Sequence, residues 1–169
     1  MGLTLILSRH GKSSWADPET EDFDRPLNDR GRTAATRLGR WLAKRDLVPD
    51  EVLVSGARRT VETWAGMAPE MDSTPGMRTE RGLYLAAPDA MLEVLRGATG
   101  ARVLMIGHNP GIARFAQALA AAPARHDRFA DYPTGATTVI GFDDTGDGWA
   151  GIGWGDGRVR DFVVPRELG

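Results

Sequence analysis

The sequence predicts an α/β protein, a three-layer α/β/α sandwich with a mostly parallel central sheet. Three short aliphatic runs indicate this fold: LTLIL (3–7), EVLV (51–54) and RVLMI (102–106). Runs of this length are typical of strands that helices bury on both faces. Segments with helical periodicity separate the runs, and such alternation favours an α/β sandwich. The 169 residues fit one domain, which we expect to span 1–169.

Apolar residues recur at helical spacing in four segments: 29–46, 58–68, 88–97 and 109–122. Asn28 has the side chain of a helix N-cap. The third segment begins with Pro88 and ends at Gly97, the usual asymmetry of helix ends. In the fourth segment we expect Asn109 to be the cap and Pro110 to lie in the first turn.

Three further strands are predicted near the C-terminus, at TTVIGF (137–142), WAGIGW (149–154) and RVRDFVV (158–164). Turns rich in glycine and aspartate separate them. The longest irregular segment, 15–29, is polar and acidic and follows the first strand closely. Long ordered loops often lie beside functional sites, so we expect this loop to overhang one.

Composition excludes several classes of partner. Lys+Arg 21 against Asp+Glu 23 leaves a net charge of -2, without the cationic excess that displaces counterions from nucleic acid. Cys 0 removes disulfides and thiolate nucleophiles. No apolar run approaches the ~18 residues of a membrane span, so we expect no membrane partner. The N-terminal segment lacks the features of a signal peptide, and we expect a cytoplasmic protein.

Cationic and imidazole side chains follow each of the three aliphatic runs. Arg9 and His10 follow the first, Arg58 and Arg59 the second, and His108 the third. Ligands of open α/β sheets collect beyond the carboxyl ends of the strands, so these side chains should meet at one edge. Helical segments begin beside them, and free N–H groups at helix starts favour anions. The sequence therefore predicts a local cationic pocket suited to a phosphoryl group.

The letters GKSS (11–14) suggest a nucleotide-binding P-loop, but the spacing excludes one. That pattern needs a glycine five residues before Gly11, where this chain has Ile6 inside an aliphatic run. We also expect no metal and no other cofactor. Two separated histidines without paired carboxylates are a poor metal-ligand set, and Arg9 would repel a cation.

Several motifs resemble those of the histidine phosphatase superfamily, which has the phosphoglycerate-mutase-like fold. LSRHGKSSW (7–15) is similar to its R-H-G signature, and GHNPG (107–111) to its second-histidine motif. SGARRTVET (55–63) is similar to its S-x-x-x-R-A-x-x-T segment, with Thr60 in place of the usual alanine. DFDRPLNDRG (22–31) and YPTGA (132–136) resemble the small phosphohistidine phosphatase (SixA-type) branch, whose cap domain is minimal.

The resemblance implies a role for each matched residue. His10 would be the nucleophile that accepts the phosphoryl group, and Arg9, Arg59 and His108 would bind its oxygens. The position of a serine four residues earlier selects Arg59 over Arg58. Further contacts to the phosphate or the substrate are expected from Gly11, Ser13, Arg25 and Asn109. The expected partner is a protein carrying phosphohistidine or a small phosphate compound.

Two positions depart from the family pattern. Ala16 stands where the superfamily usually has asparagine. Relatives that cleave phosphate esters have an acidic residue at a position that falls on Leu85 here. The remaining candidates for a general acid are nearby carboxyls: Glu80, Asp22 and Asp24.

Three functions therefore stay open at the level of sequence. The first is a phosphatase that acts on protein phosphohistidine through His10. The second is a phosphatase for small phosphate esters that uses one of the candidate acids. The third is a module that binds phosphate or phosphoprotein without turnover. Mutase activity is disfavoured, because it needs a cap that the chain has little length to build.

Overall fold

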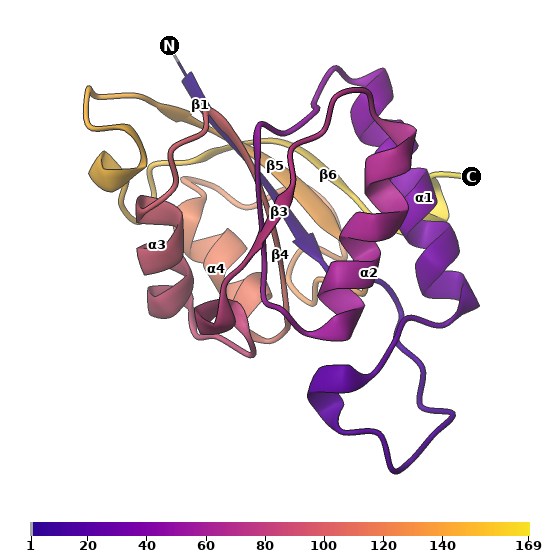
Figure 1. The fold of residues 1–169 in the computed structure, drawn as a ribbon. Coiled ribbons are helices and arrows are strands. Elements are labelled where there is room, and N and C mark those ends of the chain that lie inside the picture. Colours follow the sequence, from indigo (N-terminus) through magenta and orange to yellow (C-terminus); the bar gives the residue numbers. More distant parts are fainter. Residues whose placement is uncertain (1) are drawn as a thin grey trace.

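Six strands form one mixed sheet in the computed structural model, which describes residues 2–169 (Figure 1). They are β1 (Gly2–Arg9), β2 (Glu51–Val54), β3 (Met77–Thr79), β4 (Arg102–Gly107), β5 (Thr137–Asp143) and β6 (Arg158–Val163). Their order across the sheet is β3-β2-β4-β1-β5-β6. Neighbours from β3 to β1 pair in parallel, while β5 is antiparallel to both β1 and β6. Only β5 opposes the other strands, which confirms the mostly parallel sheet.

Helices cover both faces of the sheet. They are α1 (Asp29–Lys44), α2 (Arg58–Met67), α3 (Pro88–Arg96) and α4 (Gly111–Leu119). Short 3-10 turns occupy Asp22–Asp24, Ala68–Glu70, Arg81–Leu83, Gly148–Gly151 and Pro165–Glu167. One apolar cluster joins α1 and α2 to the sheet, and a larger cluster joins α3 and α4 to the opposite face. The predicted three-layer α/β/α sandwich is confirmed.

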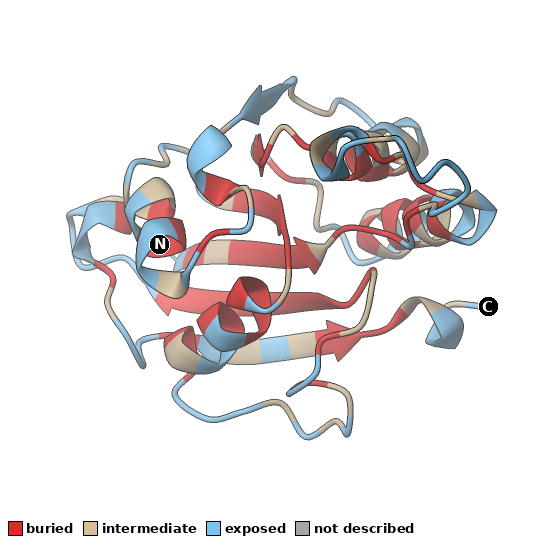
Figure 2. Ribbon diagram, turned by 90° about the horizontal axis from the view of Figure 1, so that it is seen from below, coloured by how far each residue is buried: buried red, intermediate tan, exposed pale blue. Residues whose placement is uncertain are grey.

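Alternation along β1 shows how one strand serves both clusters. Leu5 and Leu7 belong to the cluster of α3 and α4, whereas Ile6 between them belongs to the cluster of α1 and α2. All three are fully buried, since neighbouring side chains of a strand point to opposite faces. Figure 2 shows buried residues along the central strands. Burial on both faces accounts for the continuous aliphatic run in the sequence.

Two predicted elements differ in the structure, and one strand is not predicted from the sequence. Residues 149–154 are not a strand, because a 3-10 turn at Gly148–Gly151 buries Trp149 against Phe142. The helix predicted over 109–122 spans Gly111–Leu119, and its N-cap is Pro110 rather than Asn109. The side-chain oxygen of Asn109 nevertheless accepts a hydrogen bond from the amide of Ala113 in the first turn of α4. Sequence periodicity does not predict β3, whose three residues are all exposed.

The helix starts agree better with their sequence signals. The side chain of Asn28 caps α1 by accepting a hydrogen bond from the amide of Gly31 at 2.9 Å, as predicted. α3 begins at Pro88 and ends before Gly97. No helix within residues 2–169 is long and apolar enough to cross a membrane.

The long irregular segment leaves the sheet at the carboxyl end of β1. Figure 1 shows it projecting beyond the strand ends before the chain turns into α1. Backbone contacts tie its two ends together, since the amide of Ser14 donates to the carbonyl of Pro26 and that of Asn28 to Lys12. The segment is thus a closed loop standing at the edge where the histidines were predicted to meet.

Candidate active site

Strand register brings the two histidines together. β1 and β4 pair in parallel with Arg9 opposite Gly107, so His10 and His108 follow at the same level. The amide of His10 donates to the carbonyl of Gly107 at 3.2 Å. The imidazole centroids lie 5.3 Å apart. β2 ends beside β4, which brings Ser55 and the start of α2 to the same edge.

His10 is a buried neutral imidazole with one free nitrogen. Its Nδ1 lies 2.7 Å from the carbonyl oxygen of Gly11, and because a carbonyl only accepts, Nδ1 carries the hydrogen. Nε2 therefore keeps its lone pair. Burial is the largest influence and lowers the pKa of His10 to about 3, opposed by the Gly11 hydrogen bond and reinforced by the charges of Arg59 and Arg9.

His108 is also buried and neutral, but both of its nitrogens are engaged. Arg59 donates from Nη2 to Nδ1 of His108 at 3.2 Å, so Nδ1 carries the lone pair. Nε2 then donates to Oγ of Ser55 at 2.7 Å. Burial, followed by the charges of His10 and Arg59, lowers the pKa of His108 to about 3. The two imidazoles thus adopt opposite tautomers.

A chain of hydroxyl groups fixes His108 from behind. Oγ of Ser55 lies 3.1 Å from Oγ1 of Thr60, which donates to the carbonyl of Ala57 at 2.7 Å. With the threonine hydrogen committed to that carbonyl, the serine hydroxyl donates to Thr60. The threonine that replaces the usual alanine of the family motif therefore completes a relay from imidazole to backbone.

Two guanidinium groups, one buried and one half-buried, supply positive charge to the pocket. Arg59 is almost fully buried on α2, and Arg9 is half-buried at the end of β1. Nη1 of Arg9 donates to the carbonyl of Tyr132 at 3.1 Å. Burial and the charge of Arg59 lower the pKa of Arg9, but a guanidinium remains charged at neutral pH. Nε of each arginine is buried and has no hydrogen-bond acceptor among residues 2–169.

Asp22 links the projecting loop to this pocket as an ionised carboxylate. Its Oδ2 accepts hydrogen bonds from Arg59 at 3.0 Å and from the Tyr84 hydroxyl at 2.5 Å. Its Oδ1 accepts from Arg25 at 3.1 Å. Partial burial acts to raise its pKa, but the hydrogen bonds from Tyr84 and Arg59 outweigh burial and lower the pKa of Asp22 to about 2.

The other two candidate acids lie outside this network. Glu80 accepts a hydrogen bond from Arg78 at 2.8 Å on the surface. Asp24 is exposed, and its side chain has no hydrogen bond or ion pair within residues 2–169. Leu85, at the position where relatives have an acidic residue, is 56% exposed. None of these residues places a protonated carboxyl group beside His10.

Four residues that the sequence predicts to contact the phosphate or the substrate make contacts within the protein. The amide of Gly11 donates to Thr63, and a side chain at Gly11 would collide with the backbone of Gly31 at 2.9 Å. Ser13 accepts a hydrogen bond from Arg25, whose guanidinium also lies 3.6 Å from the ring centroid of Trp15. The Asn109 amide donates to the carbonyls of Asp131 and Tyr132. In the structure these contacts join the segments around the pocket to one another.

Sequence reasoning missed the part played by Tyr84 and Thr63. Tyr84 packs edge-on against His108 with ring centroids 5.4 Å apart and holds Asp22, yet it comes from an irregular segment without periodicity. Thr63 is the last residue of the motif beginning at Ser55, which was the one available signal. Within residues 2–169 no group of three or more histidine, aspartate or glutamate side chains is arranged to hold a metal ion.

Comparisons with known proteins identify the family of the chain. The model of the histidine phosphatase superfamily (branch 1) matches residues 5–84. An uncharacterized protein of Mycobacterium tuberculosis is 32% identical over 165 residues, covering 94% of this chain and 99% of the relative. The chain belongs to the histidine phosphatase superfamily. The matched region of the family model carries His10, Arg9 and Arg59.

Solved structures of the superfamily place the chain near its SixA-type members. A candidate phosphohistidine phosphatase SixA from Nakamurella multipartitia has a TM-score of 0.80 at 26% identity, covering 98% of this chain and 97% of its own. A protein histidine phosphatase SixA complexed with tungstate has a TM-score of 0.81 at 19% identity, covering 99% and 100%. The second likeness concerns the fold alone. Coverage of both chains almost end to end agrees with the predicted minimal cap.

Proposed function

We propose that the protein is a phosphatase that removes phosphoryl groups from histidine side chains of other proteins, through a phosphohistidine intermediate on His10. The observation that carries this proposal is the free Nε2 of His10. Its Nδ1 hydrogen is committed to the Gly11 carbonyl, and its low pKa keeps the lone pair available at neutral pH. A neutral imidazole held beside buried arginines is equipped for nucleophilic attack on phosphorus.

Two bonds form and two break in the proposed cycle. Nε2 of His10 attacks phosphorus, and the bond between phosphorus and the substrate imidazole breaks. The departing imidazole takes a proton from solvent. Water then attacks the phosphoryl group on His10, the second P–N bond breaks, and inorganic phosphate leaves with His10 restored. No oxidant, reductant or metal is needed for this balance.

The cations of the pocket suit the charge that such a transfer carries. Charge spreads over the equatorial oxygens of the transferring phosphoryl group, so positioning and fixed positive charge do most of the catalytic work. Arg9 and Arg59 present planar donors, and their buried Nε groups lack acceptors among residues 2–169. The charges of both arginines act on His10, where a tetrahedral oxyanion is bound in this proposal. The structure of the SixA protein with tungstate shows that a protein of this fold accommodates an anion of that shape.

The carboxyls around the pocket favour phosphohistidine over phosphate esters. An alkoxide leaving group needs a positioned acid. Asp22 is held ionised by Tyr84 and Arg59, and Leu85 carries no proton. An imidazole leaves as a neutral base once its ring is protonated, and solvent supplies that proton because the unperturbed pKa is ~6.5. The pocket therefore suits phosphohistidine, whose cleavage needs no acid from the enzyme.

The proposal is tested by comparing three substrates with the purified protein. We expect kcat/KM to be highest for a phosphohistidine peptide, intermediate for an activated aryl phosphate and lowest for an alkyl phosphate. Phosphate release measured at neutral pH gives the order. Equal efficiency on alkyl phosphate, lost in Glu80→Gln or Asp24→Asn, would overturn the proposal and establish a small-ester phosphatase.

A further inference from the structure

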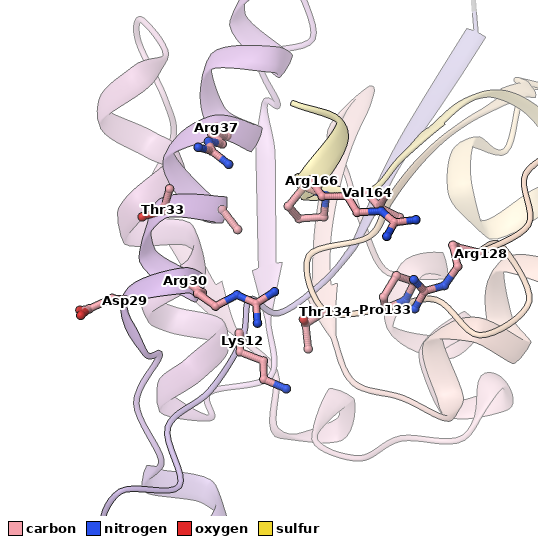
Figure 3. A pocket seen from close by; sticks show the side chains of 12 residues that line it. Lys12, Asp29, Arg30, Thr33, Arg37, Arg128, Pro133, Thr134, Val164 and Arg166 are labelled. Atoms are coloured by element: carbon pink, nitrogen blue, oxygen red, sulfur yellow. The ribbon is translucent and has the colours of Figure 1, made fainter. Parts of the chain in front are cut away.

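A basic cavity of about 570 Å³ lies beside the catalytic edge (Figure 3). Its walls are the turn after β1, the first half of α1, the segment around 128–134 and the residues that follow β6. Five of its lining side chains are cationic: Lys12, Arg30, Arg37, Arg128 and Arg166. The chain as a whole carries a net charge of -2, so this cluster is a local concentration of positive charge.

Most of these cations are not neutralised by the protein. Arg128 pairs with Asp131 at 2.9 Å. The other four have no carboxylate partner within residues 2–169. The one acidic residue of the wall, Asp29, pairs with Arg32, and Figure 3 shows its carboxylate pointing away from the cavity. The cavity therefore offers its charge to a ligand.

Backbone close to His10 forms part of the cavity lining. Lys12 is two residues beyond His10, so their Cα atoms are at most about 7.6 Å apart. On the other side, the amide of Gly135, next to the lining residue Thr134, donates to the carbonyl of His10 at 2.9 Å. Backbone next to His10 therefore forms part of the cavity lining on two sides, through Lys12 and Thr134.

The arrangement of charges fits an extended chain better than one compact anion. Arg30 and Arg37 lie about 10 Å apart along α1, and Figure 3 shows the cations around the rim rather than directed at one point. Aliphatic residues form the floor: Ala34, Pro133, Val164 and Pro165. Carboxylates on alternate residues of an extended peptide are about 7 Å apart, and the methylenes of glutamate suit such a floor.

We propose that this basic cavity binds acidic side chains flanking the phosphohistidine, so that the enzyme selects phosphoproteins whose acceptor histidine lies in acidic surroundings. The inference rests on the proposed function, since it names the class of protein substrate for that same site. From the distances above, the recognised carboxylates lie about two to five residues from the phosphohistidine in an extended substrate. Salt weakens the selection, because exposed charges attract one another less at high ionic strength.

The test compares matched substrates with matched variants. Two synthetic phosphohistidine peptides differ only in having glutamate or glutamine at the flanking positions, and free phosphohistidine is the third substrate. In low salt the wild type should favour the glutamate peptide in kcat/KM by about tenfold, and 0.5 M sodium chloride (roughly a 4 Å screening length) should remove most of this preference. Arg30→Gln/Arg37→Gln should lose the preference and keep its rate on free phosphohistidine.

The control variant removes the same amount of charge from the second half of α1 and from Arg45, the residue that follows it. Arg40 and Arg45 pair with Glu70 and Asp161 outside the cavity, so Arg40→Gln/Arg45→Gln should keep the preference. Equal turnover of both peptides by the wild type overturns the inference and leaves the proposed function standing. Tight binding of inorganic triphosphate that Arg30→Gln/Arg37→Gln abolishes, with equal peptide turnover, overturns it in favour of a small polyanion. Failure to hydrolyse free phosphohistidine or either peptide, with aryl phosphate still cleaved, contradicts the proposed function itself.

Discussion

Single hydrogen bonds decide which of the two histidines is equipped to be a nucleophile. His10 commits Nδ1 to a carbonyl and keeps Nε2 free, whereas His108 has Arg59 on one nitrogen and Ser55 on the other. Both rings are buried and have low pKa values, so burial does not separate them. The tautomers do. With these tautomers His108 holds Arg59 in place, while His10 is free to carry the covalent intermediate.

Neighbouring arginines on α2 give the first prediction. Arg59 is buried and contacts His108 and Asp22, while Arg58 is exposed and pairs with Glu62. Losing a preorganised donor to a transition state typically lowers kcat by about 10²–10³-fold, and we expect that loss for Arg59→Ala. Arg58→Ala removes one surface ion pair and should change kcat less than about threefold. Steady-state kinetics on an aryl phosphate, with circular dichroism to verify folding, measures both.

Equal losses of kcat in the two variants would contradict the assignment of Arg59, rather than Arg58, to the transition state. They would mean that the buried guanidinium has no special relation to the transferring group. Arg59→Lys extends the comparison, because lysine keeps the charge and lacks the planar fork of donors. It should recover only part of the lost rate.

Among the structural elements, the Asp22 carboxylate joins the loop between β1 and α1 to helix α2 and to Tyr84. Asp22 accepts hydrogen bonds from Arg25 within the loop, from Arg59 on α2 and from Tyr84 beyond β3. Asp22→Asn should therefore free the loop, seen as faster amide hydrogen exchange over residues 15–28. The rate of hydrolysis should fall less than about tenfold, well below the 10²–10⁴-fold contribution of a general acid.

Asp24→Asn is the matched control, since Asp24 lies in the same 3-10 turn without a side-chain hydrogen bond in the described chain. Neither exchange nor rate should change in it. A general acid contributes about 10²–10⁴-fold to the rate. If Asp22→Asn lowered the rate of hydrolysis by about 100-fold or more and left amide hydrogen exchange unchanged, Asp22 would act in the chemistry.

Sequence periodicity predicts those elements in which buried apolar residues recur at regular spacing. β1, β2, β4 and the four helices fall where aliphatic runs and apolar stripes indicate. β3 has no such signal because its residues are exposed, and 149–154 alternates like a strand although Trp149 donates to the carbonyl of Gly100 from a 3-10 turn. The side-chain amide of Asn109 donates to the carbonyl of Tyr132, and no local cap rule predicts this contact between residues 23 positions apart.

The site follows the same division. Motifs placed His10, Arg9, Arg59 and His108 at one edge, because parallel register makes strand ends coincide. The hydroxyl relay through Thr60 and the hold of Tyr84 on Asp22 depend on side-chain directions and on contacts 62 residues apart. Sequence spacing carries no record of such contacts.

At the scale of the whole molecule, the two neutral histidines tie stability to pH. Their folded pKa values of about 3 lie below the unfolded value of ~6.5. Below pH ~6.5 the unfolded chain therefore binds more protons, so the stability that these groups contribute is complete above that pH and is lost toward pH 3. Between pH 7.5 and 5.5 each histidine should lower the free energy of unfolding by about 1.4 kcal/mol.

Urea unfolding at the two pH values measures this effect as a fall in the midpoint. His10→Gln removes one titrating group and should reduce the pH dependence by about half. A midpoint that stays constant or rises as the pH falls would contradict the neutral, buried state of both rings.

Trapping a phosphoenzyme is the decisive experiment for His10 as the nucleophile. Phosphohistidine is stable in base and labile in acid, so a reaction stopped in alkali within one turnover preserves it for peptide mass spectrometry. The assignment of His10 as the nucleophile predicts a phosphoryl group on His10 in the wild type, none on His108, and no hydrolysis by His10→Ala. A phosphoryl group on any other residue, or turnover by His10→Ala near the wild-type rate, would contradict it.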